Sequence, residues 1–127
     1  MTPAPDLLAG PTRVLVCGDR YWTDTETLYA RLDRLPRADL VIIEGEARGA
    51  DTLARQWAES RSVAYLPFPA NWNLYGKRAG ILRNQQMLDE GKPHCVIAFH
   101  HNLDASKGTR DMVKRAREAG LPTEVVP

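Results

Sequence analysis

Glycine and charged residues follow three apolar segments of this chain, in turns with the composition of anion-binding sites. A glycine turn that leads into a helix offers unpaired backbone N–H groups, which bind phosphate or carboxylate groups. We therefore expect a small anionic ligand, and a nucleotide fits the pattern best. The three turns are Cys17-Gly18-Asp19-Arg20, Glu44-Gly45-Glu46-Ala47-Arg48-Gly49-Ala50-Asp51 and Ser106-Lys107-Gly108-Thr109-Arg110-Asp111.

The first turn begins directly after the apolar segment 13–16. Gly18 allows a sharp turn and a close approach of the backbone to a ligand. Arg20 is suited to a phosphate or carboxylate, and Asp19 is suited to accept a hydrogen bond from a ribose hydroxyl or a base. The alternative is a tight turn that carries two solvated charges.

The second turn leads into a helix that we expect to open at Gly49 or Ala50. Gly45 and Gly49 flank Arg48, and Asp51 falls in the first helical turn, where a carboxylate suits the helix dipole. We predict that these five residues bind the ligand. The spacing matches neither the P-loop nor the dinucleotide fingerprint. The alternative is that Asp51 caps the helix and the glycines only form the turn.

A polar residue interrupts the apolar face of the helix predicted to end near residue 90. Asn84 shares that face with Gly80 and Met87, and Arg83 lies beside it. We predict that Arg83 and Asn84 face the ligand. The alternatives are a buried amide that holds a loop and a surface cation.

The segment 67–77 is the longest irregular stretch that the sequence predicts. Loops of this length are often functional. Trp72 is expected either to stack on a base or to pack the loop onto the sheet. Lys77, at the end of the segment, is predicted to contact the ligand.

The third turn offers a helix N-terminus with a cation and a hydroxyl group. We predict that Lys107, Gly108 and Thr109 bind the ligand. Asp111 is either a partner of the helix dipole or an acid/base group.

Five apolar segments alternate with helical patterns, which predicts an α/β fold. We expect a single Rossmann-like, three-layer domain with a five-stranded parallel sheet, helices on both faces and the strand order 3-2-1-4-5. The ligand should lie where the first and fourth strands end, because strand order reverses there. The predicted strands are 13–16, 40–43, 63–66, 95–99 and 123–126.

The composition is that of one ordinary globular domain of 127 residues, with a net charge of +1. We expect a flexible tail over 1–12 and a nucleotide-binding domain over 13–127. The near-neutral charge does not favour nucleic acid as a partner. Without a signal-like or membrane-spanning segment, we expect a cytoplasmic protein that has no membrane partner.

The cysteines and histidines do not suggest a cofactor. Cys17 and Cys95 fall at opposite ends of their predicted strands, so we expect two free thiols. His100 and His101 are adjacent on an extended segment and point to opposite sides. We predict no metal site and no cofactor.

Taken in order along the chain, the motifs resemble the SLOG superfamily, specifically its YspA-like branch. The similarity extends from about Arg13 to Val126. The residues that carry it are Val16-Cys17-Gly18-Asp19-Arg20, Gly45-Glu46-Ala47-Arg48-Gly49-Ala50-Asp51, Ala70-Asn71-Trp72, Tyr75-Gly76-Lys77, Ala79 to Met87 and Lys107-Gly108-Thr109.

This resemblance implies a Rossmann-like fold that binds nucleotides or nucleotide-derived ligands. The superfamily includes the Lonely Guy phosphoribohydrolases, which have a similar arginine motif and a PGGxGT turn followed by a catalytic glutamate. The resemblance therefore implies Arg83 and Asp111 as catalytic candidates. Here Ser106 and Lys107 replace residues of that turn, and Asp111 is shorter than glutamate. The resemblance thus implies binding more strongly than hydrolysis.

Three functions remain open at this point. The first is binding of a nucleotide-type ligand, for sensing or sequestration. The second is N-glycosidic hydrolysis of nucleoside monophosphates. The third, implied by DNA-uptake relatives in the superfamily, is single-stranded DNA binding, although the net charge disfavours nucleic acid. A homodimer is left open.

Overall fold

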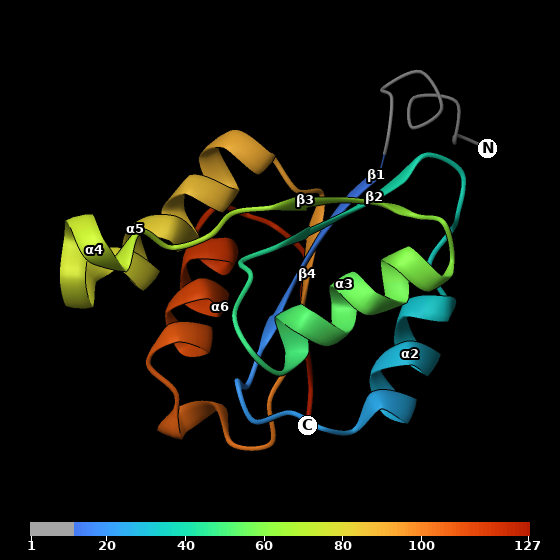
Figure 1. The fold of residues 1–127 in the computed structure, drawn as a ribbon, viewed down its shortest axis with the longest axis horizontal. Coiled ribbons are helices and arrows are strands. Elements are labelled where there is room, and N and C mark those ends of the chain that lie inside the picture. Colours follow the sequence, from blue (N-terminus) through green and yellow to red (C-terminus); the bar gives the residue numbers. More distant parts are fainter. Residues whose placement is uncertain (1–11) are drawn as a thin grey trace.

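The computed structural model describes residues 12–127, and it contains the predicted five-stranded parallel sheet in the order β3-β2-β1-β4-β5 (Figure 1). The predicted tail lies outside the described residues, apart from Thr12, which already belongs to β1 and pairs with Leu40. The strands are β1 Thr12–Gly18, β2 Leu40–Glu44, β3 Ala64–Pro67, β4 Cys95–Phe99 and β5 Thr123–Val126.

Helices cover both faces of the sheet, with α2 and α3 on one side and α5 and α6 on the other (Figure 1). The longer helices are α2 Thr25–Asp33, α3 Ala50–Ser60, α5 Ala79–Gln86 and α6 Gly108–Glu118. Short helical turns are α4 Trp72–Tyr75, η1 Gly76–Arg78, η2 Met87–Gly91 and η3 Leu103–Ala105.

Alternation along the central strands produces two separate cores. In β1, Val14 and Val16 pack toward Trp57 of α3, whereas Leu15 and Cys17 pack on the opposite face. This is the two-residue period of a strand that is buried on both sides. The fold is therefore the expected three-layer α/β domain.

The region between β3 and β4 differs from the sequence prediction. The segment 67–77 is largely ordered into the end of β3, α4 and η1, rather than being irregular. The helix expected to reach residue 90 ends as α5 at Gln86 and continues as a π-helical turn, η2. In Figure 1, α4 lies at the outer side of α5, away from the sheet.

Candidate functional site

A pocket of about 640 Å³ lies where β1 and β4 end, at the predicted switch point. Its walls come from the turn after β1, from α5, from the loop after β4 and from the first residues of α6. We call this cavity the strand-end pocket. Its position follows from the neighbouring β1 and β4, because both strands deliver their following loops to the same edge of the sheet.

Most of the residues predicted to bind a ligand line the strand-end pocket. They are Gly18, Asp19, Arg20, Asp51, Trp72, Arg83, Asn84, Lys107, Gly108 and Thr109. The remaining predicted residues lie outside its lining, and they are Gly45, Arg48, Gly49, Ala50, Lys77 and Asp111.

The turn after β1 is held tightly against the end of β4. The Asp19 N–H donates a hydrogen bond to the Phe99 carbonyl oxygen at 2.8 Å. A Cβ atom at Gly18 would clash with that same oxygen, so only glycine fits there. The Asp19 carboxylate accepts from the Tyr21 N–H at 2.9 Å, and Arg20 remains exposed. Arg20 is therefore the side chain of this turn that is available to an anion.

The start of α3 packs against this first turn. Gly49 has a φ of 71°, and a Cβ atom there would clash with the Asp19 carbonyl oxygen. The Ala50 N–H donates to that oxygen at 3.2 Å. The Ala50 N–H group, at a residue predicted to bind the ligand, is therefore hydrogen-bonded within the protein. The second turn reaches the pocket through Ala47 and Asp51.

Asp51 is a buried carboxylate in the pocket wall, with an exposed fraction of 4%. Its Oδ2 accepts hydrogen bonds from the Gly45 N–H at 3.0 Å and the Ala47 N–H at 3.2 Å. Burial raises the pKa of Asp51 to about 6, although Arg83 and these N–H groups act in the opposite direction. Asp51 thus shapes the second turn and also faces the cavity.

Glu44, at the end of β2, is a second buried carboxylate beside Asp51. Its Oε1 accepts from the Glu46 N–H at 2.6 Å, and its Oε2 has no hydrogen-bond partner among residues 12–127. Burial raises the pKa of Glu44 to about 7, the Glu46 N–H opposes that rise, and the charge of Asp51 adds to it. Glu44 stands at the head of the second predicted turn but was not among the predicted site residues, because its burial cannot be read from the sequence.

Arg83 and Asn84 of α5 connect the second turn to α6. The Arg83 guanidinium donates to the Gly45 carbonyl oxygen and to Asn84 Oδ1. Asn84 Nδ2 donates to the Gly108 carbonyl oxygen at 3.2 Å and to Asp111 Oδ2 at 3.1 Å. Both residues line the pocket, but their polar groups are largely engaged by the protein. They have the positions expected of ligand-facing residues and also the contacts expected of structural ones.

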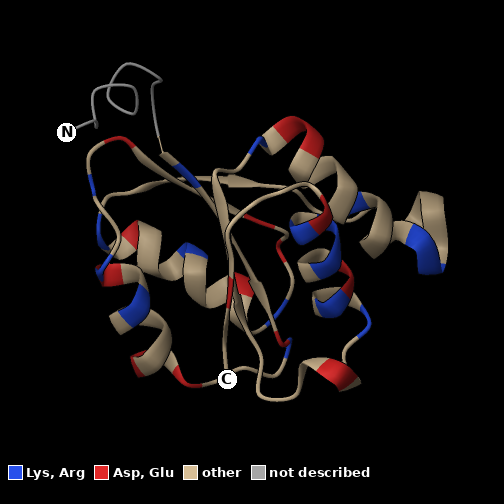
Figure 2. Cartoon of the chain, turned by 180° about the vertical axis from the view of Figure 1, so that it is seen from behind, with Lys and Arg blue, Asp and Glu red and all other residues tan. Residues whose placement is uncertain are grey.

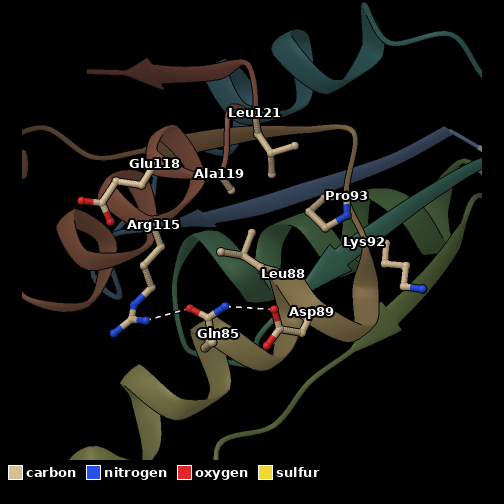
Figure 3. Close-up of a pocket in the computed structure, with 9 residues that line it drawn as sticks. All are labelled: Gln85, Leu88, Asp89, Lys92, Pro93, Arg115, Glu118, Ala119 and Leu121. Atoms are coloured by element: carbon tan, nitrogen blue, oxygen red, sulfur yellow. Dashed lines mark hydrogen bonds between the residues drawn. The ribbon is translucent and has the colours of Figure 1, made fainter.

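Asp111 is not part of the pocket lining, although it contacts the lining residue Asn84. Its carboxylate accepts from Arg115 Nε at 2.9 Å, and Arg115 Nη1 donates to Gln85 Oε1 at 2.7 Å. Figure 3 shows Arg115 and Gln85 beside a second cavity of about 480 Å³, where Leu88 and Leu121 also lie. We call this cavity the α6 hollow.

The start of α6 is open toward the strand-end pocket. Lys107 and Gly108 are exposed, and Ser106 Oγ accepts from the Thr109 N–H at 3.0 Å. The preceding loop is held in place by His101, whose ring stacks on Trp22 with centroids 4.3 Å apart. This helix N-terminus is therefore open to the pocket at Lys107 and Gly108, whereas the Thr109 N–H is taken up by Ser106.

Two exposed aromatic residues stand at the pocket. Trp72 is 59% exposed, and its ring lies close to Gly80 of α5. Tyr21 is 76% exposed and was missed by the sequence analysis, although it directly follows the predicted Arg20. Asn102 was missed as well, because nothing in the sequence distinguishes it from other loop residues.

The cysteines are unpaired, as predicted: Cys17 is buried and Cys95 is partly buried. Burial, with a smaller contribution from Asp51, raises the pKa of the Cys17 thiol far above its usual value. Within residues 12–127, no group of three or more His, Cys, Asp or Glu side chains is arranged to hold a metal ion. In the same part of the chain, no helix has the length and apolar character needed to cross a bilayer.

Comparison with solved structures identifies the same fold in DNA processing protein A (DprA) from Streptococcus pneumoniae. The TM-score is 0.67 with 20% sequence identity, and the match covers 96% of this chain. It covers 52% of the DprA chain, so the protein spans about half the length of that relative. At this level of identity, the similarity shows the fold alone.

Sequence comparisons identify the family. Gene 61 protein of Mycobacterium phage D29 is 41% identical over 118 residues, which cover 87% of this chain and 92% of the phage protein. A model of the YAcAr family, described as the YspA, cpYpsA-related SLOG family, matches residues 12–75. These matches confirm the resemblance that the motifs predicted, and the chain belongs to the YspA, cpYpsA-related SLOG family.

Proposed function

We propose that the protein binds a nucleotide or nucleotide-derived small ligand in the strand-end pocket, for sensing or sequestration. The observation that carries this proposal is the open N-terminus of α6 in a cavity at the switch point of a parallel sheet. Lys107 and Arg20 supply positive charge there, and Trp72 offers an aromatic face for a base. Anionic and aromatic parts of one ligand would thus find matching groups in one cavity.

Calorimetry tests this proposal with a panel of nucleoside mono-, di- and triphosphates, nucleosides and inorganic phosphate. We expect saturable binding of at least one nucleotide, tighter than that of phosphate. Lys107→Ala should weaken nucleotide binding about tenfold, the usual effect of losing a charge-assisted contact. Lys114→Ala provides a matched control, because Lys114 is exposed on the same helix and outside the pocket lining. Equal affinity for nucleotides and phosphate would reject the proposal.

Hydrolysis of nucleoside monophosphates has less support than binding. A catalytic carboxylate must lie within hydrogen-bond reach of its water or substrate. Asp111 lies outside the pocket lining and accepts hydrogen bonds from Arg115 and Asn84. We therefore expect neither the wild type nor Asp111→Asn to release base from AMP, as chromatography of the reaction mixture would show.

Single-stranded DNA binding is a second candidate, because aromatic and basic side chains are interleaved at the pocket. Tyr21 and Trp72 are exposed there together with Arg20 and Lys107, and such surfaces stack bases and neutralise phosphates. Against this, Figure 2 shows basic and acidic residues intermixed over the helices, in line with the net charge of +1. A steep loss of oligonucleotide affinity with added salt would favour this function over mononucleotide binding.

A further inference from the structure

Asp51 differs from the other groups of the strand-end pocket because it is acidic and almost fully buried. It enters the wall from the start of α3, while the basic side chains Arg20 and Lys107 are exposed. A pocket for a bare anion would gain nothing from a carboxylate in its wall. The position of Asp51 therefore points to a second, non-anionic part of the ligand.

One oxygen of Asp51 is committed to the protein and the other is not. Oδ2 accepts from the Gly45 and Ala47 N–H groups, whereas Oδ1 accepts no hydrogen bond from any residue within 12–127. Among residues 12–127, the buried side-chain atoms without a hydrogen-bond partner are Glu44 Oε2 and Arg55 Nε, so Oδ1 of the lining residue Asp51 is accessible rather than sealed in the core. A donor to Oδ1 therefore comes from water or from a ligand in the pocket.

The charged and titratable groups around Asp51 do not supply that donor. They are Cys17 from β1, Glu44 from β2 and Arg83 from α5. The Arg83 guanidinium donates instead to the Gly45 carbonyl oxygen and to Asn84. Burial leaves Asp51 with a pKa of about 6, so a ligand donor would also stabilise its charged form.

We propose that Asp51 is a specificity-determining residue of the strand-end pocket, whose Oδ1 accepts a hydrogen bond from a hydroxyl or amine group of the ligand. This inference rests on the proposed nucleotide function. In a nucleotide such as AMP, the donor is a ribose hydroxyl or the exocyclic amine of the base. Asp51 thereby favours nucleotides over inorganic phosphate, which offers the pocket charge without the sugar or base.

The variant Asp51→Asn inverts the hydrogen-bonding character of the pocket wall. Its Oδ1 is able to accept from Gly45 and Ala47 as the carboxylate does, which turns its NH₂ group toward the ligand. We expect AMP affinity to fall 10- to 100-fold, while the affinity for inorganic phosphate stays within twofold. Asp104→Asn, at an exposed carboxylate outside the pocket lining, makes the same chemical change and should bind AMP like the wild type.

Two AMP analogues identify the donor. The 2′,3′-dideoxy analogue lacks the ribose hydroxyls, and purine riboside monophosphate lacks the exocyclic amine. The wild type should bind one of them at least tenfold more weakly than AMP, and Asp51→Asn should lose that preference. Circular dichroism and thermal melting establish that the variant is folded.

The outcomes separate this inference from the proposed function. If the wild type binds no nucleotide better than phosphate, the proposed function fails and the inference fails with it. If the wild type binds AMP and both analogues equally, the inference alone is overturned, and this result requires no variant. A folded Asp51→Asn protein with wild-type affinity for AMP would also overturn it.

Discussion

The starts of α3 and α6 look alike in sequence but have opposite environments in the structure. Each follows a buried parallel strand, has a glycine at its start (Gly49 as the N-cap of α3, Gly108 as the first residue of α6) and carries an aspartate in its first turn. At α3 the backbone packs against the Asp19 carbonyl oxygen and Asp51 is buried. At α6 the backbone is exposed, and Asp111 pairs with Arg115. The same local motif thus builds a closed wall in one place and an open helix N-terminus in the other.

Substituting the two glycines should give the largest contrast between these helix starts. Gly49→Ala places a Cβ atom against the Asp19 carbonyl oxygen at a φ of 71°, and we expect a loss of about 2 kcal/mol or more in unfolding free energy. Gly108→Ala meets nothing within 4 Å, and should change stability by only about 0.5 kcal/mol. Chemical denaturation measures both effects. Similar losses at the two glycines would contradict the contrast.

The buried carboxylates near α3 predict a pH dependence of stability. Folding raises the pKa of Glu44 from 4.5 to about 7, so the folded state binds more protons than the unfolded state between these values. Stability should therefore fall as pH rises through this window. Glu44→Gln removes this contribution and should stabilise the protein at pH 8 by about 1–3 kcal/mol, with little effect at pH 4.

Thermal melts of Glu44→Gln from pH 4 to pH 8 make the measurement. Glu118→Gln is a suitable control, because Glu118 is exposed at the end of α6 and should leave the pH profile unchanged. If the melting temperatures of the wild type and of Glu44→Gln changed by the same amount between pH 5 and pH 8, Glu44 would not be the cause of the pH dependence.

The aspartate of α6 should give the smallest effect. Its ion pair with Arg115 is partly exposed, with side-chain exposures of 21% for Asp111 and 31% for Arg115. Pairs of this kind contribute about 0.5–1 kcal/mol at most. We therefore expect Asp111→Asn to lower the unfolding free energy by no more than that in urea denaturation. A loss of several kcal/mol would show that Asp111 is as integral to the fold as Asp51.

The sequence predicts the sheet well because its signals are local. Apolar segments, helix periodicity and the handedness of parallel crossovers lead to the strand order without any knowledge of side-chain contacts. The positions of Gly18, Asn84 and Lys107 at the pocket follow from that order, because each lies at or near the edge where strands end.

The difference between Gly49 and Gly108 is not local, and the sequence does not reveal it. The packing of Gly49 depends on how close the turn after β1 approaches the start of α3, which only the folded sheet defines. The ion pair between Asp111 and Arg115 is easier to predict from the sequence, because Arg115 lies four residues after Asp111 on the same helix. Glu44 and Tyr21 required knowledge of burial and of the neighbouring elements.

A nitrogen-15 NMR titration with AMP tests the central claim most directly, because it reports where the ligand binds. The account predicts saturable shifts of the backbone amides of Tyr21, Gly108 and Thr109, around the strand-end pocket. Amides of Leu88 and Ala119, in the α6 hollow, should remain unchanged. Shifts confined to the α6 hollow, or no shifts at millimolar AMP, would contradict the account.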